Sequence, residues 1–149
     1  MKLEDEIKQT KPFKSEFQKL ILNISVTSSW LNAVFAERLK PLGISPHQYN
    51  VLRILKGKHP AGYCNQEITG RMIDKSSNAT RIVDKLVEKK LVIRNEHEAD
   101  RRLVDIRITD KGINLLKEIE KRPVGDKKMK VFNEEKARLM NEWLDEMRG

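Results

Sequence analysis

One short stretch of the chain is rich in small hydrogen-bonding side chains and cations. It contains Lys75, Ser76, Ser77, Asn78, Thr80, Arg81 and Lys85, at the N-terminal half and on the outward face of a predicted helix. Hydroxyl and amide groups bind phosphates and base edges, and Arg binds guanine, so this composition is typical of a helix that enters the major groove of DNA. The solvated start of an ordinary helix favours the same residue types. Taken alone, the stretch leaves both interpretations open.

A second charged group, Asp100-Arg101-Arg102, falls where the returning strand of a predicted hairpin begins. An Arg at the end of a thin hairpin can reach into a narrow minor groove, where negative potential is concentrated. We expect Arg102 to enter the groove and Asp100 to hold its guanidinium in a fixed orientation. A solvent-exposed ion pair is the commoner explanation of such a pair by itself. A charged hairpin directly after two short helices is a more specific combination than either part.

The chain offers little for metal or nucleophilic chemistry. The histidines and the cysteine, which are residue types that can bind zinc, are His47, His59, His97 and Cys64. Their positions show neither His-x-x-x-His nor Cys-x-x-Cys spacing. Cys64 falls where the pattern requires an apolar residue, which favours a small buried thiol. Because the sequence also contains no Ser-His-Asp set and no glycine-rich phosphate loop, we predict that the protein is not an enzyme and holds no metal and no cofactor.

Length and charge narrow the class of protein. The 149 residues make one domain, residues 1–149. The formal net charge of +8, from 30 Lys and Arg against 22 Asp and Glu, favours a polyanionic partner. The longest apolar runs, such as residues 33–36, are too short to span a membrane, and the first residues lack the apolar core of a secretion signal. One cysteine suits a reducing compartment, so we expect a cytoplasmic protein with no membrane partner.

A long helix is predicted after a loose polar segment over residues 1–12. Apolar residues from Phe17 to Leu39 recur at steps of three and four, and Pro41 and Gly43 end the pattern. A helix of about 25 residues exceeds the usual globular length, so we expect it to pack against something larger than its own small domain.

Two short helices joined by a polar turn are predicted next, after a helix that Ser45, Pro46 and Gln48 open with a capping box. Asn65 is expected to cap the first short helix. The apolar stripes predicted to face the core are Val51, Leu52 and Leu55, then Ile68, Met72 and Ile73, then Ile82, Val83, Leu86, Val87 and Leu91. Two short helices around the polar turn at residues 74–77 are the helix-turn-helix arrangement.

The hydrophobic period then changes from helical to alternating. Residues 104–108 alternate between apolar and polar, which predicts a β-hairpin together with the apolar run at residues 91–93. Thr109 is expected to cap the helix that follows, and Asn133 to cap the last one. The apolar face of that last helix, which has no evident partner within the chain, carries Ala137, Met140, Trp143, Leu144 and Met147.

Together these residues resemble the multiple antibiotic resistance regulator (MarR) family of bacterial transcription regulators. The matching motifs are Gln48 with Val51-Leu52, the helix over residues 78–86, the Asp100-x-Arg102 of the hairpin, and the Thr109-x-x-Gly112 that opens the following helix. The resemblance covers about residues 13–120. It has two departures. Lys90 occupies a position where the family often has Gly, and Pro123 interrupts residues 122–131, where many relatives continue a long helix.

The resemblance implies a mostly α fold with a small β-hairpin wing, assembled as a homodimer. Residues 45–109 would form the winged-helix DNA-binding region, and residues 13–40 and 110–149 the dimerisation helices. The length of the first helix and the unpartnered apolar face of the last helix support a dimer independently, although the two ends could pack against each other within one chain. The dimer would bind a pseudo-palindromic operator in double-stranded DNA. Its recognition helices would lie in successive major grooves, and its wings, with Arg101 and Arg102, in the flanking minor grooves.

The family often releases DNA when a small aromatic or phenolic ligand binds. We therefore expect a repressor of a nearby operon with an effector of that kind. Core packing is the expected role of Trp30, Phe35 and Tyr49, the apolar groups that could line an effector cavity. Two alternatives remain open. A winged-helix module that docks a protein would bind DNA weakly and with little dependence on salt, and a redox- or metal-sensing regulator would use Cys64 or the histidines.

Overall fold

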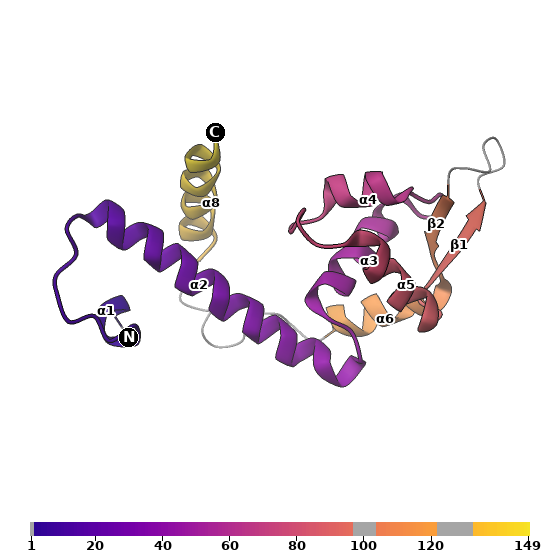
Figure 1. The fold of residues 1–149 in the computed structure, drawn as a ribbon, viewed down its shortest axis with the longest axis horizontal. Coiled ribbons are helices and arrows are strands. Elements are labelled where there is room, and N and C mark those ends of the chain that lie inside the picture. Colours follow the sequence, from indigo (N-terminus) through magenta and orange to yellow (C-terminus); the bar gives the residue numbers. More distant parts are fainter. Residues whose placement is uncertain (1, 97–103, 122–132) are drawn as a thin grey trace. The chain divides into compact units, whose positions relative to one another are not determined.

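The computed structural model describes residues 2–96, 104–121 and 133–149 (Figure 1). It consists of two compact units, Met1–Leu116 and Lys117–Gly149. The elements are α1 (Leu3–Glu6), α2 (Glu16–Leu39), η1 (Lys40–Leu42), α3 (Pro46–Lys58), α4 (Asn65–Arg71), α5 (Ala79–Glu88), β1 (Val92–Glu96), β2 (Val104–Ile108), α6 (Asp110–Glu120) and α8 (Glu134–Arg148). The predicted fold class, mostly α with a small β-hairpin, is confirmed. Within the described ranges, none of these helices is long and apolar enough to cross a membrane.

Helix α2 confirms the long helix predicted from the apolar period. The Ser15 hydroxyl caps its start by accepting a hydrogen bond from the Gln18 amide at 3.2 Å. Its 24 residues end at the 3-10 turn η1, which contains Pro41. Gly43 follows with a φ of 69°, a left-handed conformation that glycine adopts without steric cost. The proline and the glycine therefore end the helix as predicted.

The segment predicted to be loose, residues 1–12, contains the helical turn α1. Leu3 is buried, and the Glu4 carboxylate forms an ion pair with the Lys19 ammonium of α2 at 2.5 Å. The hydrogen bond from Lys19 lowers the pKa of Glu4 below its ordinary value. The prediction was wrong here because one buried leucine and one ion pair to a distant helix hold the turn, and the local sequence shows neither.

Helix α3 begins with the predicted capping box and contacts α4, α5 and β2. The Ser45 hydroxyl accepts from the Gln48 amide at 3.2 Å, and Gln48 Oε1 accepts from the Ser45 amide at 3.2 Å. The inner face of α3 carries the fully buried Val51, Leu52 and Leu55, as predicted. This apolar face is the base on which the two short helices and the hairpin pack.

Helices α4 and α5 form the predicted helix-turn-helix. The cap residue of α4 is Cys64 and not Asn65, because the Glu67 carboxylate reaches back and accepts from the Cys64 amide at 2.9 Å. Asn78 caps α5 by accepting from the Arg81 amide at 3.0 Å. The buried side chains of this pair of helices and the intervening turn are Ile68, Met72, Ala79, Val83 and Leu86.

Two predicted core residues of this region are exposed. Ile73 has 89% of its surface exposed and Val87 has 37%. Helix α4 ends at Arg71, and Met72 is already extended, with φ −65° and ψ 143°, so the chain has left the helical period before Ile73. Val87 lies about 100° round the helix axis from the buried Leu86, at the margin of the inner face.

The end of α5 holds a lysine in a left-handed conformation, because Lys90 has a φ of 60°. The Leu91 amide donates to the Leu86 carbonyl at 3.0 Å, and the Lys90 amide donates to the Val87 carbonyl at 2.8 Å. These are the two hydrogen bonds of a Schellman motif, in which this position favours glycine because glycine has no Cβ. The departure at Lys90 noted in the sequence therefore falls on a backbone position that strains any larger residue.

Strands β1 and β2 form the predicted antiparallel hairpin, with Arg94 opposite Ile106. Ile106 and Ile108 are buried and Arg107 between them is exposed, as the alternation predicts. Tyr63 adds a bridge to this sheet, because its amide and carbonyl each bond to Ile106 at 3.0 Å. The predicted tip residues Asp100, Arg101 and Arg102 lie outside the described residues.

The hairpin is closed at its base, next to the start of α6. The Thr109 amide donates to the Leu91 carbonyl at 3.0 Å. The Thr109 hydroxyl accepts from the Gly112 amide at 3.2 Å, which confirms the predicted cap. A Cβ on Gly112 would lie 2.4 Å from the Leu91 carbonyl oxygen, so only glycine fits this approach.

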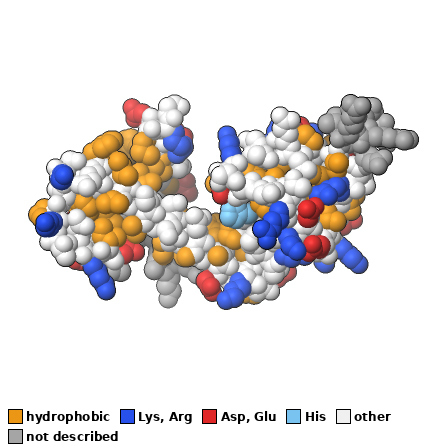
Figure 2. All heavy atoms as spheres, in the orientation of Figure 1, with side chains coloured by type: hydrophobic (Ala, Val, Ile, Leu, Met, Phe, Trp, Pro, Cys, Tyr) orange, Lys and Arg blue, Asp and Glu red, His pale blue; other side chains and the backbone are white. Residues whose placement is uncertain are grey.

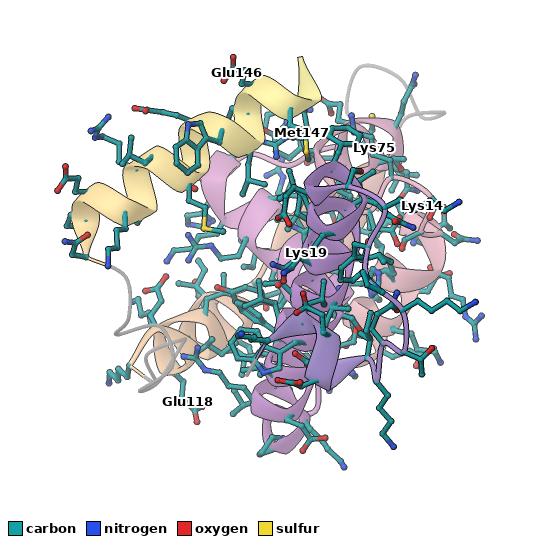
Figure 3. The ribbon with its side chains drawn as sticks, turned by 90° about the vertical axis from the view of Figure 1, so that its left-hand side faces the viewer. Lys14, Lys19, Lys75, Glu118, Glu146 and Met147 are labelled. Carbon is teal, nitrogen blue, oxygen red and sulfur yellow. The ribbon has the colours of Figure 1, made fainter. Side chains whose placement is uncertain are left out.

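Helix α8, in the second unit, begins at the predicted cap and exposes its apolar face. Asn133 accepts a hydrogen bond from an amide of the first turn at 2.9 Å. Met140, Trp143 and Met147 are exposed, Trp143 by 66%, and no residue of α8 is buried. The side chains of Glu146 and Met147 leave the helix in different directions (Figure 3).

Candidate nucleic-acid interface

The predicted DNA-binding residues that the structure describes lie together on one turn and one helix. They are Lys75, Ser76, Ser77 and Asn78 before α5, and Thr80, Arg81 and Lys85 on it. Ser77 is half-buried and the others are exposed. The start of α5 is therefore a polar, partly cationic surface. The remaining three predicted residues, Asp100, Arg101 and Arg102, belong to the segment that is not described.

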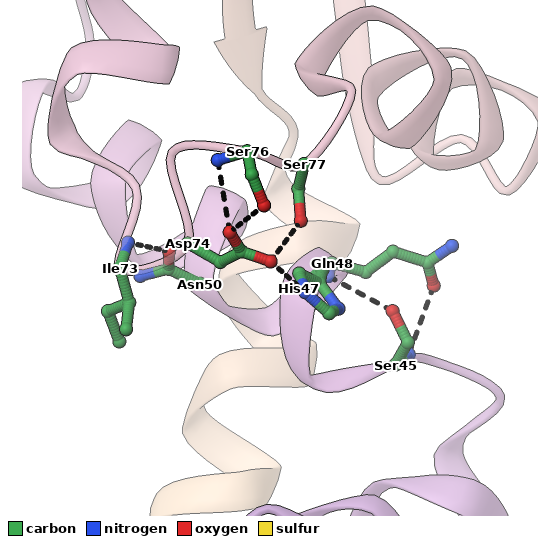
Figure 4. Close-up of polar contacts among 8 residues, drawn as sticks. All are labelled: Ser45, His47, Gln48, Asn50, Ile73, Asp74, Ser76 and Ser77. Carbon is green, nitrogen blue, oxygen red and sulfur yellow. Dashed lines mark hydrogen bonds and ion pairs between the residues drawn. The ribbon is translucent and has the colours of Figure 1, made fainter.

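The Asp74 carboxylate organises the turn between α4 and α5 (Figure 4). Oδ1 accepts from the Ser76 amide at 3.0 Å and from the Ser76 hydroxyl at 2.6 Å. Oδ2 accepts from the Ser77 hydroxyl at 2.7 Å and faces Nε2 of His47 at 3.3 Å. The two hydroxyl donors, the Ser76 amide and His47 hold the pKa of Asp74 well below its usual range. Asp74 therefore carries its negative charge at neutral pH.

Sequence reasoning missed Asp74 as a member of the site. The signal was present, because Asp and Asn side chains commonly bond the backbone two residues later and form an Asx turn. An Asp followed by Ser at two and three residues has the spacing for this turn. The turn was predicted, but its central carboxylate was not.

Two side chains of α3 hold the same turn. Asn50 Oδ1 accepts from the Ile73 amide at 3.0 Å, and His47 contacts Asp74 (Figure 4). His47 and Asn50 are three residues apart and so lie on one face of α3. The turn that leads into α5 is therefore fixed to the helix that carries the core of the unit.

Ion pairs occupy part of the outward surface of α5. Lys85 Nζ lies 3.0 Å from a Glu88 carboxylate oxygen, so its charge is partly offset. Asp84 pairs with Arg94 of β1 at 2.6 Å, which joins α5 to the hairpin. Figure 2 shows charged side chains of both signs over the region of α5. Arg81, by contrast, is exposed near the start of the helix.

A second basic cluster surrounds Tyr63, which pairs with Ile106 in the middle of β2. The Lys58 ammonium lies 4.1 Å from the centroid of the Tyr63 ring, and the Arg71 guanidinium lies 4.3 Å from it. Both are within the range of cation–π attraction. The Glu67 carboxylate is 3.6 Å from Lys58, and its pKa is lowered chiefly by the hydrogen bond from the Cys64 amide. Periodicity did not predict this cluster because its members come from separate elements.

Lys89, just after the last residue of α5, has a structural role. Its ammonium donates to Gln48 Oε1 at 2.9 Å and to the Gly43 carbonyl at 2.5 Å. Gln48 is the residue that completes the capping box of α3. The end of α5 is thereby tied to the start of α3.

The residues considered for metal binding do not form a cluster in the described part of the chain. Among the described residues, no three His, Cys, Asp or Glu side chains are grouped so that they could hold a metal ion. His97 lies outside that part. The rings of Phe35 and Tyr49, considered for an effector cavity, contact each other with centroids 6.4 Å apart.

Comparison with known proteins decides the family. The MarR family model matches residues 44–104. The HTH-type transcriptional regulator MhqR of Bacillus subtilis (strain 168) is 32% identical over 130 residues, which cover 85% of this chain and 87% of that protein. The chain belongs to the MarR family. It is therefore a transcription regulator with a winged helix-turn-helix, and not an enzyme.

Solved structures have the same MarR-type fold at lower identity. The transcriptional repressor CouR, bound to a 23-mer DNA duplex, is 18% identical with a TM-score of 0.77, over 94% of this chain and all of that one. The organohalide-sensing regulator RdhR-CbdbA1625, in its 2,4-dichlorophenol-bound form, is 18% identical with a TM-score of 0.78, over 94% of this chain and 86% of that one. The MarR segment 44–104 includes the Asp74 turn and all of α5.

Proposed function

We propose that this MarR-family chain is a homodimeric repressor that binds a pseudo-palindromic operator through α5 and its hairpin. The observation that carries the proposal is the turn fixed by Asp74, which presents exposed Lys75, Ser76 and Arg81 at the start of a helix anchored to the core. Short polar groups and cations at this place are what major-groove recognition requires. Asp100, Arg101 and Arg102 complete the proposed contact surface, with Arg102 in the minor groove.

Exposed apolar faces support a homodimer. On α2, Phe17 is 70% exposed, and Leu20 and Ile21 are exposed on the same helix. On α8, Trp143 and Met147 are exposed. Figure 2 shows hydrophobic side chains at the surface over α2 and α8. Apolar surface of this kind marks an interface, and we assign residues 13–40 and 110–149 to contact with a second copy.

Repression and release are proposed from the relatives. CouR is a repressor, and RdhR-CbdbA1625 is an organohalide sensor with 2,4-dichlorophenol bound. By this analogy of fold, the chain represses a nearby operon and releases DNA when a small aromatic or phenolic effector binds. Because a regulator of this kind works where the DNA is, we propose a cytoplasmic location.

The test is selection of bound sequences from random duplex DNA with the full chain. We expect an inverted repeat whose half-sites are about 10 base pairs apart, one helical turn of DNA, because a two-fold dimer places its recognition helices in successive major grooves. Analytical sedimentation of the free protein should give a dimer. If no sequence is enriched and duplex affinity does not depend on salt, the chain is instead a winged-helix module that docks a protein.

A further inference from the structure

In the turn between α4 and α5, the hydroxyls of Ser76 and Ser77 both donate hydrogen bonds to the carboxylate of Asp74. The Ser76 and Ser77 oxygens lie 2.6 and 2.7 Å from the two oxygens of Asp74 (Figure 4). A hydroxyl has one hydrogen and two lone pairs, whereas an ionised carboxylate can only accept. Each serine is therefore the donor, at a distance typical of charge-assisted hydrogen bonds.

The arrangement persists at neutral pH because Asp74 is ionised there. Its pKa is lowered by the hydroxyls of Ser76 and Ser77, by the Ser76 amide and by His47. To donate to another acceptor, either serine would have to break its charge-assisted hydrogen bond to the Asp74 carboxylate. The hydroxyl hydrogens are thus unavailable to a nucleic acid.

The two serines differ in accessibility. Ser76 is exposed, while Ser77 is half-buried. The accessible part of the Ser76 oxygen offers lone pairs only. Phosphate oxygens also offer only lone pairs, so the Ser76 hydroxyl and a phosphate cannot form a hydrogen bond in this geometry.

The major groove presents two kinds of amine that can donate to such an acceptor, N4 of cytosine and N6 of adenine. We propose that Ser76 accepts a hydrogen bond from the exocyclic amine of a cytosine or adenine, so that it reads a base and does not bind a phosphate. Asp74 is the positioning residue that gives Ser76 this polarity. The inference rests on the proposed function and assigns Ser76 a role in its specificity.

The experiment removes the amine and the hydroxyl in turn. Operator duplexes found by selection are made with 2-pyrimidinone in place of each cytosine, or purine in place of each adenine, since these bases lack only the amine. Affinities of the full wild-type chain and of Ser76→Ala are measured by fluorescence anisotropy. At one position per half-site, each change alone should weaken binding by about 3- to 10-fold, as expected for one hydrogen bond. When both changes are made together, the loss of affinity should be no greater than the larger of the two single losses. The base whose amine removal weakens binding shows whether Ser76 contacts a cytosine or an adenine.

Ser77→Ala is the matched control, because it removes the same kind of hydrogen bond from the same carboxylate. Its effect should not depend on the amine at any position. Ser76→Thr keeps a hydroxyl and should keep the dependence on the amine. Thermal unfolding of each variant separates loss of fold from loss of contact.

Two results would overturn the assignment. One is additivity of Ser76→Ala and amine removal at every cytosine and adenine. The other is an equal loss for Ser76→Ala on operator and random duplex, which would make Ser76 a phosphate contact. If the wild-type chain selects no sequence at all, the proposed function fails, and this inference fails with it. Sequence selection without coupling at Ser76 overturns this inference alone.

Discussion

The guanidinium of Arg94 lies 2.6 Å from the carboxylate of Asp84, and this contact joins the hairpin to α5. Arg94 is in β1, the strand that leads to the proposed groove contacts, and Asp84 is in the middle of α5. Each side chain is partly exposed, by 34% and 48%. An ion pair this exposed adds little to the stability of the fold, so the role we expect for it is to orient the strand relative to the helix.

Arg94→Ala should weaken operator binding more than it weakens folding. An ion pair this exposed contributes less than about 1 kcal/mol to stability. We expect roughly a 10-fold loss of operator affinity, equivalent to about 1.4 kcal/mol, because the hairpin is no longer held against α5. Anisotropy titrations and urea unfolding measure the two effects. Glu88→Ala is the control, since it breaks the Lys85 pair on the same helix without touching the hairpin. Full additivity of Arg94→Ala and Asp84→Ala on affinity would contradict this role.

Lys90→Gly should stabilise the protein. Lys90 has a φ of 60°, and a left-handed conformation costs a residue with a Cβ about 1–2 kcal/mol. Glycine relieves this strain but is more flexible when unfolded, so a net gain of about 1 kcal/mol is expected. The urea midpoint reports the change. Gly43→Ala tests the same physics in reverse: φ is 69° and nothing lies near an added Cβ, so backbone strain alone should destabilise the fold. A lower midpoint for Lys90→Gly would refute the account.

Asp74 should contribute stability that is lost in acid. Its folded pKa is below the ordinary 3.8, so the unfolded chain binds a proton at a higher pH than the folded chain. The contribution is complete above about pH 5 and declines as the pH falls toward the folded pKa. Asp74→Asn should therefore flatten the dependence of the urea midpoint on pH below about pH 5. Glu4 and Glu67, whose pKa values are also lowered, remain in the variant, so part of the slope should persist. An unchanged slope would mean that the Asp74 hydrogen bonds are equally strong in the unfolded chain.

Operator binding should weaken steeply with salt. A dimer with roughly 6–10 phosphate contacts loses about 10³- to 10⁵-fold in affinity between 50 and 200 mM salt, because bound counterions are released.

Arg81→Ala tests whether Arg81 contacts a base or a phosphate. If Arg81 reads a base, the variant should lose about 1–3 kcal/mol on operator and relax selection at one position per half-site. A similar loss on random duplex, with a salt slope reduced by about one, would make Arg81 a phosphate contact instead.

Local signals in the sequence were enough to locate most helix ends. Ser45, Thr109 and Asn133 cap helices as predicted, because a short polar side chain can satisfy an amide one turn ahead wherever the neighbouring fold goes. The predicted cap at Asn65 was wrong by one residue, because the cap of α4 is Cys64. The hairpin register likewise follows from alternation, since a slip of one residue would expose Ile106.

Contacts between separate helices and strands could not be predicted from the sequence. Asp84 and Arg94 meet only because the end of α5 turns the chain back along the helix. Asn50 and Ile73 are 23 residues apart, and their hydrogen bond depends on how α3 packs against α4. The exposure of Ile73 follows from the place where α4 ends, which hydrophobic periodicity does not resolve.

The closure between Leu91 and Thr109 bears on how the hairpin can change during evolution. The ends of the hairpin are joined there, and Gly112 is packed against the same carbonyl. Insertions and deletions between the strands therefore leave α5 and α6 in place, and natural length variation should concentrate in that segment. Within either strand, changes of two residues keep the inward side, whereas a change of one reverses it. The hairpin, and with it the proposed contact to DNA, could thus change in length without refolding the rest of the domain.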